Sequence, residues 1–217
     1  GFSIINVSFI AIKMKHIFKK LTEKDNKLSK ILESDIHCIF LKKEKFTANQ
    51  HFLSLCREII GQQLSVKAAK SIWERFIKGI KSNKKLIEKI QSINIEDHKL
   101  HGLSRNKLTF LKELSEKFIN KEIGFKKFDQ MENEEIINHL ITIKGIGRWT
   151  AEMFLIFSMK RLDVFSVDDL GLRKAVKKLY NLKNDDREKI LKISSKWKPY
   201  RSIVSWYLWR ALDRKII

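Results

Sequence analysis

The sequence predicts an all-α protein, and three observations support this fold class. One proline and eight glycines are all that interrupt the 217 residues, which favours long helices over turn-rich β architecture. Apolar residues recur at helical spacing along most of the chain. The length is sufficient to bury one large core or two smaller lobes that share a cleft.

The first 46 residues, 1–46, are expected to form an N-terminal segment that packs on the helical body. Residues 1–12 are apolar but too few to span a bilayer, and positive charges follow this run rather than precede it. We interpret the run as a non-native leader or a first packing segment, with Met14 as a candidate natural start. Apolar spacing over residues 15–33 predicts two short helices around a polar break at Asp25, and residues 38–46 are interpreted as a connector.

Residues 47–217 form the expected helical body, whose lobes share the terminal helices. Two buried helical faces over residues 49–80 are broken at Gly61, and a shorter helix follows Ser82. Gly102 indicates a helix stop, and Ser104 is the expected N-cap of the next helix. Further helices are predicted over residues 134–143, from residue 148 through 157, from an aspartate cap at residue 168 or 169 to Tyr180, and over residues 200–212.

The chain is strongly basic. It carries 45 Lys and Arg residues against 25 Asp and Glu residues, a formal net charge of +20 that is spread along its length. Such a charge indicates a polyanionic partner, with nucleic acid as the natural candidate. The alternative is a basic surface that follows from a Lys- and Ile-rich composition and only keeps the protein solvated.

Cysteine and histidine usage excludes several kinds of site. Cys38 and Cys56 are neither closely spaced nor near a histidine cluster, so a disulfide framework, a zinc site and a four-cysteine iron–sulfur cluster are all unsupported. A reducing, intracellular setting follows. The six histidines include no metal-binding pair on a shared helical face, and none of them is assigned to catalysis.

The most informative stretch is Ile-Lys-Gly-Ile-Gly-Arg-Trp-Thr-Ala at residues 143–151, where one helix ends and the next begins at once. Gly145 and Gly147 have no Cβ to obstruct close approach, and the backbone N–H groups at the start of the second helix can stabilise a phosphate. We assign these glycines, with Arg148 and Thr150, to sequence-independent contacts with DNA. The alternative is a tight interhelical turn in which glycine serves only as a cap.

A second motif, Val-Phe-Ser-Val-Asp-Asp, ends at Asp169, twenty positions beyond Trp149. Together, residues 143–151 and 164–174 resemble the helix–hairpin–helix DNA glycosylase superfamily, and within it most of all the 3-methyladenine DNA glycosylase II group. Three further stretches are similar to that group, and the resemblance extends from about Phe46 to the end of the chain. They are Ile-Ile-Gly-Gln-Gln-Leu-Ser-Val at 59–66, Gly-Leu-Ser-Arg-Asn-Lys at 102–107, and Trp-Lys-Pro-Tyr-Arg-Ser at 197–202 leading into Trp209.

The resemblance implies two helical lobes with the hairpin and Asp169 at the cleft between them. It implies a monofunctional enzyme of base-excision repair that hydrolyses the glycosidic bond of alkylated purines in double-stranded DNA, chiefly 3-methyladenine, with 7-methylguanine as a further substrate. Two alternatives remain open at this stage. One is a bifunctional glycosylase with lyase activity on oxidised bases, disfavoured because Trp149 stands where such enzymes carry a lysine. The other is a non-catalytic DNA-binding protein that kept the hairpin.

Asp169 is the candidate catalytic carboxylate. The resemblance places the functional acid at this second aspartate, which leaves Asp168 a structural role. Cleavage of an N-glycosidic bond develops oxocarbenium character on the sugar, and a fixed carboxylate stabilises that charge and can orient a water molecule. The alternative is that the aspartates only cap the helix that begins near Leu170. The two roles are compatible, because a helix N-terminus favours the ionised carboxylate.

The resemblance also assigns the surroundings of the base. Trp149 and Met153 are four residues apart on one helical face, and Trp209 is expected across the pocket from them; Met153 departs from the tyrosine of close relatives. Gln63 aligns with the residue that fills the space left by a flipped base, with an ordinary polar bend residue as the alternative. Trp73, Trp197 and Trp206 are expected mainly in the core.

The remaining expectations concern ligands and setting. The backbone carbonyls of Ile141, Ile143 and Gly145 correspond to those that hold a structural monovalent cation in the family, and no organic cofactor is implied. The partner is double-stranded DNA with alkylated bases, with no membrane association. A monomer in an intracellular, DNA-containing compartment is expected; in a prokaryote this compartment would be the cytoplasm or nucleoid.

Overall fold

The computed structural model describes residues 2–32, 40 and 46–217, with side chains from residue 12 onward in that set. All regular secondary structure in these residues is helical, and the predicted all-α class is confirmed. The chain divides into two compact units: a terminal unit, Gly1–Glu44 with Lys160–Ile217, and a central unit, Lys45–Met159. Cys38 and most of the predicted connector lie outside the described residues. No helix among the described residues has the length and apolarity that crossing a membrane requires.

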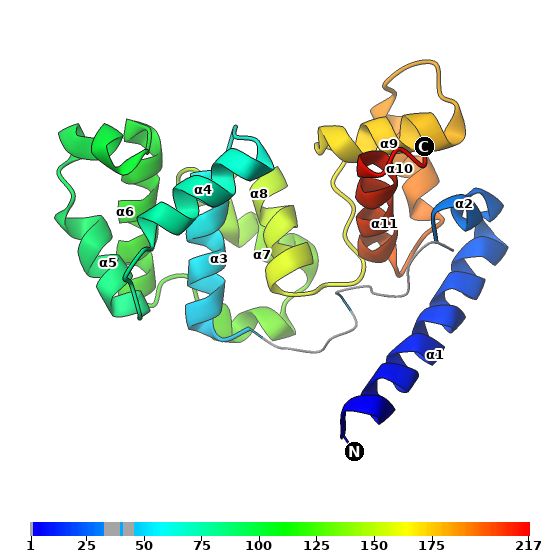
Figure 1. Ribbon diagram of the computed structural model, residues 1–217, viewed down its shortest axis with the longest axis horizontal. Helices are drawn as coiled ribbons and strands as arrows, with labels where there is room; N and C mark the ends of the chain where they lie inside the picture. Colours follow the sequence, from blue (N-terminus) through cyan, green and yellow to red (C-terminus); the bar gives the residue numbers. More distant parts are fainter. Residues whose placement is uncertain (1, 33–39, 41–45) are drawn as a thin grey trace. The chain divides into compact units, whose positions relative to one another are not determined.

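The terminal unit combines the first and the last helices of the chain (Figure 1). It contains α1 (Phe2–Lys24), the 3-10 helix η1 (Asn26–Leu28), α2 (Ser29–Leu32), α9 (Leu170–Tyr180), α10 (Arg187–Ser195) and α11 (Arg201–Asp213). The break predicted at Asp25 is confirmed, because the Asp25 side chain caps η1 by accepting from the Lys27 N–H. The first helix is longer than predicted, since it begins at Phe2, and α10 was not predicted.

The core of the terminal unit surrounds α11, which is buried along most of its length and packs on α9 and α2. Trp197 is fully buried and Trp206 nearly so, which confirms their predicted core positions. The buried carboxylate of Asp25 accepts a hydrogen bond from the Tyr180 hydroxyl at 2.5 Å and one from the Trp197 indole at 3.5 Å. A buried carboxylate is tolerated when it is hydrogen-bonded in this way.

The central unit consists of short helices. In order these are α3 (Ala48–Gly61), α4 (Val66–Phe76), α5 (Asn83–Ser92), η3 (Ile95–His101), α6 (Arg105–Ile119), η4 (Phe125–Gln130), α7 (Asn133–Leu140), α8 (Arg148–Met153) and the π-helical segment η5 (Phe154–Ser158). Ser104 caps α6 through its side chain, as predicted, and Ser82 caps α5, the helix that was expected to follow it. Gly102 ends η3 in the left-handed region, with φ 71°.

The largely aliphatic core of the central unit contains a cluster of aromatic rings. Phe52 on α3 stacks on Phe118 of α6 with ring centroids 4.5 Å apart. His51, one position earlier, is also buried, and its Nδ1 lies 2.8 Å from the Ser158 hydroxyl in η5. Burial lowers the pKa of His51, which favours the neutral ring. Trp73 was expected in the core but is only half-buried, because it lies at the border of the amphipathic α4.

Candidate active site

Asp169 is the residue from which α9 starts. Its backbone is extended, and its Oδ1 accepts the Leu172 N–H at 2.8 Å, so the carboxylate caps the helix. The same Oδ1 accepts the indole N–H of Trp209 on α11 at 2.9 Å. The carboxylate is therefore held between the backbone of one helix and a side chain of another, in a half-exposed position. The cap role that the sequence left open is confirmed.

Gly171 makes this arrangement possible. A Cβ at this position would lie 3.1 Å from Asp169 Oδ1 and 3.3 Å from Trp209 Cδ1, closer than ordinary contact. Glycine in the first turn of a helix costs about 1 kcal/mol relative to alanine, so its presence there calls for a reason. Sequence reasoning did not single out Gly171. The signal that could have identified it is a glycine within a predicted helix, two positions after the candidate carboxylate.

The residues before Asp169 are fastened by two arginines. Asp168 is exposed and forms an ion pair with Arg187 at 2.7 Å. Arg173 donates from its guanidinium to the carbonyl oxygens of Val167 and Asp168, at 2.9 and 3.1 Å. These bonds fix the backbone that leads into the cap, and they are consistent with the structural role expected for Asp168.

The predicted hairpin lies in the central unit, between the end of α7 at Leu140 and the start of α8 at Arg148. Gly145 has φ +83°, in the left-handed region, and a Cβ there would lie 2.2 Å from the Phe110 ring. Gly147 is the N-cap of α8 and supplies no side-chain cap. The first N–H groups of α8 therefore receive no acceptor from the cap residue, which is the condition for binding a phosphate oxygen.

The two side chains predicted to contact DNA at the start of α8, Arg148 and Thr150, are engaged within the protein. Arg148 donates to both carboxylate oxygens of Glu134, at 3.0 and 2.5 Å, and to Glu152 at 3.0 Å. The hydrogen bond to Glu134 contributes most to raising the pKa of Arg148. Thr150 is 3% exposed, and its hydroxyl accepts from Gln62 at 3.3 Å. Their assignment to DNA contacts stays a prediction, and the backbone of this segment presents the better donors.

The predicted pocket residues are divided between the units. In the terminal unit, Asp169 and Trp209 are brought together by the hydrogen bond already described. In the central unit, Trp149 and Met153 lie one helical turn apart on α8, where Trp149 is half-buried and Met153 is 4% exposed. The contact of Trp209 with a carboxylate was not foreseen, because the resemblance assigned its ring to the base.

Gln63 occupies an exposed turn. Leu64 N–H bonds to the Gly61 carbonyl at 3.2 Å, and Gln63 has φ 58°, a left-handed conformation that is unusual for a residue with a Cβ. Leu64 and Val66 beside it are 38% and 88% exposed. An exposed, partly apolar tip of this kind suits contact with unstacked bases, and the role of Gln63 stays a prediction.

The carbonyls proposed for a monovalent cation are neutral oxygen donors, which suit a hard cation. Ile143 O accepts the Ile146 N–H at 3.1 Å, and Gly145 O accepts the Gln62 amide at 2.7 Å. Each carbonyl oxygen has two lone pairs, so these bonds leave room for a cation, and the donor set fits one. Across the described part of the chain, no three His, Cys, Asp or Glu side chains form a metal-binding group.

Comparison with known proteins decides the family. The model of the HhH-GPD superfamily of base excision DNA repair proteins matches residues 56–199, a span that contains the hairpin and Asp169. The chain belongs to this superfamily. The resemblance drawn from its motifs is confirmed.

Two relatives and one solved structure place this HhH-GPD protein more closely. It is 40% identical over 160 residues to DNA-3-methyladenine glycosylase 1 of Schizosaccharomyces pombe, covering 72% of this chain and 70% of that protein. It is 34% identical, over an alignment of 227 positions, to the DNA-3-methyladenine glycosylase of Saccharomyces cerevisiae, and the alignment covers 88% of this chain and 77% of that protein. A structure of the Schizosaccharomyces pombe 3-methyladenine DNA glycosylase in complex with abasic DNA superposes with a TM-score of 0.73 at 30% identity, covering 91% and 97%.

Proposed function

We propose that this HhH-GPD protein is a monofunctional DNA glycosylase that hydrolyses the glycosidic bond of alkylated purines in duplex DNA, chiefly 3-methyladenine and also 7-methylguanine. The observation that carries the proposal is the Asp169 carboxylate. It is fixed at 2.8 Å by a helix N-terminus and at 2.9 Å by the Trp209 indole. The 3-methyladenine glycosylases among its relatives, at 34 to 40% identity, support the substrate class.

The proposed chemistry needs a negative charge held beside the sugar. As the bond to the base lengthens, the sugar acquires oxocarbenium character, and the Asp169 carboxylate stabilises that charge and orients or deprotonates the attacking water. It lies at the N-terminus of α9, where the helix dipole is positive and attracts negative charge. The two hydrogen bonds keep the carboxylate in place during the reaction.

The base is handled by aromatic side chains. A purine methylated at N3 or N7 is cationic, and an electron-rich indole face attracts it with about 0.5 to 2 kcal/mol. Trp149 on α8 and Trp209 on α11 are the candidates for this contact, and Met153 adds a polarisable thioether. A cationic base is also a good leaving group, so little acid catalysis is required. This preference would restrict the enzyme to alkylated bases.

The absence of a lyase step follows from the hairpin. A glycosylase with lyase activity needs a lysine amine at the hairpin position that Trp149 occupies in this chain. Lys144, the lysine of the hairpin, lies before the glycines, and its ammonium is 3.9 Å from the Glu113 carboxylate on α6. Water is therefore the nucleophile, and an intact strand with an abasic site is the product.

Binding to DNA would rest on the hairpin and the basic surface. The N–H groups at the start of α8 contact a phosphate, and a monovalent cation on the carbonyls of Ile141, Ile143 and Gly145 would add positive charge beside it. No organic cofactor is needed. We propose that the protein acts as a monomer in the compartment that holds the DNA. With a net charge of +20, its affinity should fall steeply as salt is added, because bound counterions are released from DNA.

The test is release of 3-methyladenine from methylated duplex DNA by the wild type and by Asp169→Asn, with binding to an abasic-site analogue measured in parallel. We expect the wild type to release the base and the variant to bind while its release rate falls roughly a hundredfold or more. Borohydride should trap no covalent complex. If both proteins bind DNA and neither releases a damaged base, the chain is a DNA-binding protein without glycosylase activity, and the proposal is wrong.

A further inference from the structure

The turn that carries Gln63 is held from two sides by residues for which no role has been given. Lys107, near the start of α6, donates from its Nζ to the carbonyls of Ile60 and Gln62, both at 2.8 Å. These carbonyls belong to the end of α3 and to the turn, and they flank Gly61. The bonds replace partners that the end of the helix lacks. Burial lowers the pKa of Lys107, in keeping with its inward position.

The second support is the side chain of Gln62. Its Nε2 donates to the Gly145 carbonyl at 2.7 Å and to the Thr150 hydroxyl at 3.3 Å. One residue thus connects the turn to the hairpin glycine and to the first turn of α8. Its neighbour Gln63 has φ 58°, a conformation that residues with a Cβ keep only where the surrounding structure enforces it.

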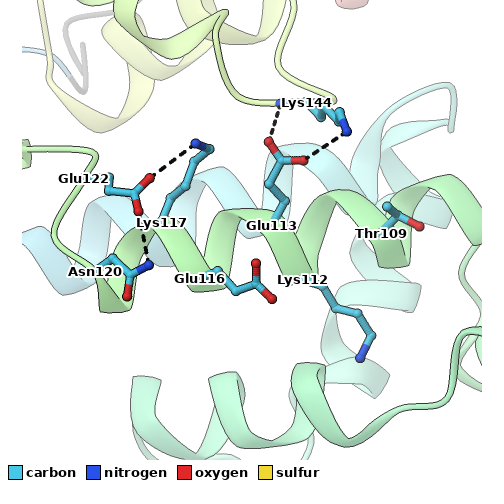
Figure 2. A pocket seen from close by; sticks show the side chains of 8 residues that line it. All are labelled: Thr109, Lys112, Glu113, Glu116, Lys117, Asn120, Glu122 and Lys144. Atoms are coloured by element: carbon cyan, nitrogen blue, oxygen red, sulfur yellow. Dashed lines mark hydrogen bonds and ion pairs between the residues drawn. The ribbon is translucent and has the colours of Figure 1, made fainter.

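Helix α6 also supports the hairpin directly. The Phe110 ring fills the space where Gly145 lacks a Cβ. Glu113 lies beside Lys144, with Oε1 3.4 Å from the backbone N–H and Oε2 3.9 Å from Nζ (Figure 2). Lys107, Phe110 and Glu113 follow one another at three-residue spacing on α6. One helix therefore supports the turn at its N-terminal end and the hairpin one to two turns further on.

We propose that Gln62 and Lys107 are positioning residues that fix the Gln63 turn relative to the phosphate-binding hairpin, so that Gln63 enters the duplex when the hairpin is seated on the backbone. The proposal rests on the proposed function in taking damaged DNA as the ligand. Within the central unit, a chain of bonded groups runs from the turn through Gln62 to Gly145. Without the Gln62 bonds, the hairpin can still contact the phosphate, but the turn is no longer fixed relative to it. Affinity for DNA that lacks a base should therefore weaken more than affinity for undamaged DNA.

The variants are Gln62→Leu and Lys107→Met, which replace each side chain by an apolar one of similar size and remove its donors. Gln91 and Lys89 provide matched controls in the same unit. Gln91 donates from its amide to the Lys112 carbonyl at 3.2 Å, and Lys89 is a lysine with a pKa lowered by burial that donates to the Phe76 carbonyl. Gln91→Leu and Lys89→Met therefore remove the same kinds of bond at a distance from the turn.

The main readout is the preference for a duplex with an abasic-site analogue over an undamaged duplex, which needs no chemistry. We expect Gln62→Leu and Lys107→Met to lower this preference about tenfold, with the controls within twofold of the wild type. Lys107→Arg should restore it, because a guanidinium can donate to both carbonyls. The fluorescence of 2-aminopurine placed opposite the lesion should be lower in complexes with these two variants than in the wild-type complex, in parallel with the loss of preference. If Lys107→Met does not fold, Gln62→Leu and Lys107→Arg carry the test.

A double-mutant cycle with Gln63→Ala identifies the route of the effect. If Gln62 acts through Gln63, the two substitutions together should cost no more preference than Gln63→Ala alone. Additive losses, or a Gln62→Leu protein with wild-type preference, would overturn the proposal. These outcomes are distinct from a failure of the proposed function, in which the wild type releases no methylated base. A wild type with no preference for the abasic duplex would overturn both.

Discussion

The hydrogen bond from Trp209 to Asp169 can be removed without removing the aromatic ring. Trp209→Phe keeps a flat apolar face but has no N–H, so Asp169 Oδ1 loses the donor at 2.9 Å and keeps the Leu172 N–H at 2.8 Å. The carboxylate still caps α9, yet it is held on one side only. We expect the chemical step to slow while binding of the substrate changes little, because the ring remains available to the base.

The size of the effect follows from the kind of bond. A hydrogen bond to a charged group contributes about 1.5 to 3 kcal/mol, and the half-exposed setting of both side chains favours the lower end. Because about 1.4 kcal/mol corresponds to a tenfold change in rate, kcat should fall roughly tenfold. Trp209→Ala should lose this factor and raise KM as well, since it also removes the face that would contact the base.

The assay is single-turnover release of 3-methyladenine from methylated duplex DNA with enzyme in excess, which isolates the chemical step. Trp206→Phe is the matched control on the same helix. Trp206 is 9% exposed and packs edge-on against Tyr207, so this change should affect stability and leave the rate of release unaltered. A Trp209→Phe protein that releases the base at the wild-type rate would refute a positioning role for the indole N–H.

Three further predictions concern single positions. Gly171→Ala should slow base release severalfold, because its Cβ would lie 3.1 Å from Asp169 Oδ1, while thermal unfolding shows Tm unchanged or raised by the better helix propensity of alanine. The pKa of His51 is lowered from its usual 6.5, so the folded state is favoured above that pH and loses stability as the pH falls below it. Urea unfolding from pH 7.5 to 5 should therefore show a free energy of unfolding that declines by up to about 1.4 kcal/mol per pH unit, and His51→Phe should reduce this decline. Gly145 has φ +83° and lies against an aromatic ring, so Gly145→Ala should destabilise the protein by more than about 1 kcal/mol in thermal unfolding and weaken binding to DNA. The space that a Cβ at residue 147 would occupy is open, so Gly147→Ala should have the Tm of the wild type.

The helix boundaries were predictable because local chemistry sets them. Ser82 and Ser104 cap the helices that follow them, and Gly102 adopts the left-handed conformation expected at a helix end. The helix α10 was missed because only Ile190 and Ile193 give it an apolar periodicity, although its N-cap, Asp186, was visible in the sequence. The π-helical segment that follows α8 has no sequence signal at all.

The site was predictable where it depends on neighbours in sequence and unpredictable where it depends on distant ones. The cap by Asp169 involves residues three positions apart, whereas its bond with Trp209 spans 40 positions and the bond of Gln62 to Gly145 spans 83. Arg148 illustrates the same limit. Its charge indicated a DNA contact, but Glu134, 14 positions earlier, lies close enough to form an ion pair with it.

The cap and the catalytic carboxylate at Asp169 are one arrangement, and substitution can separate them. Asparagine caps helices as well as aspartate does and keeps an oxygen that can accept from Leu172 and Trp209, so Asp169→Asn should unfold within about 0.5 kcal/mol of the wild type while losing base release. Asp169→Ala should lose both the activity and about 1 kcal/mol of stability, measured by urea unfolding. If the asparagine protein released the base at the wild-type rate, the negative charge would have no part in the reaction, and Asp169 would be a helix cap alone. If Asp169→Asn instead leaves the fold intact but stops base release, the negative charge of Asp169 is required for the reaction in addition to its role as a helix cap.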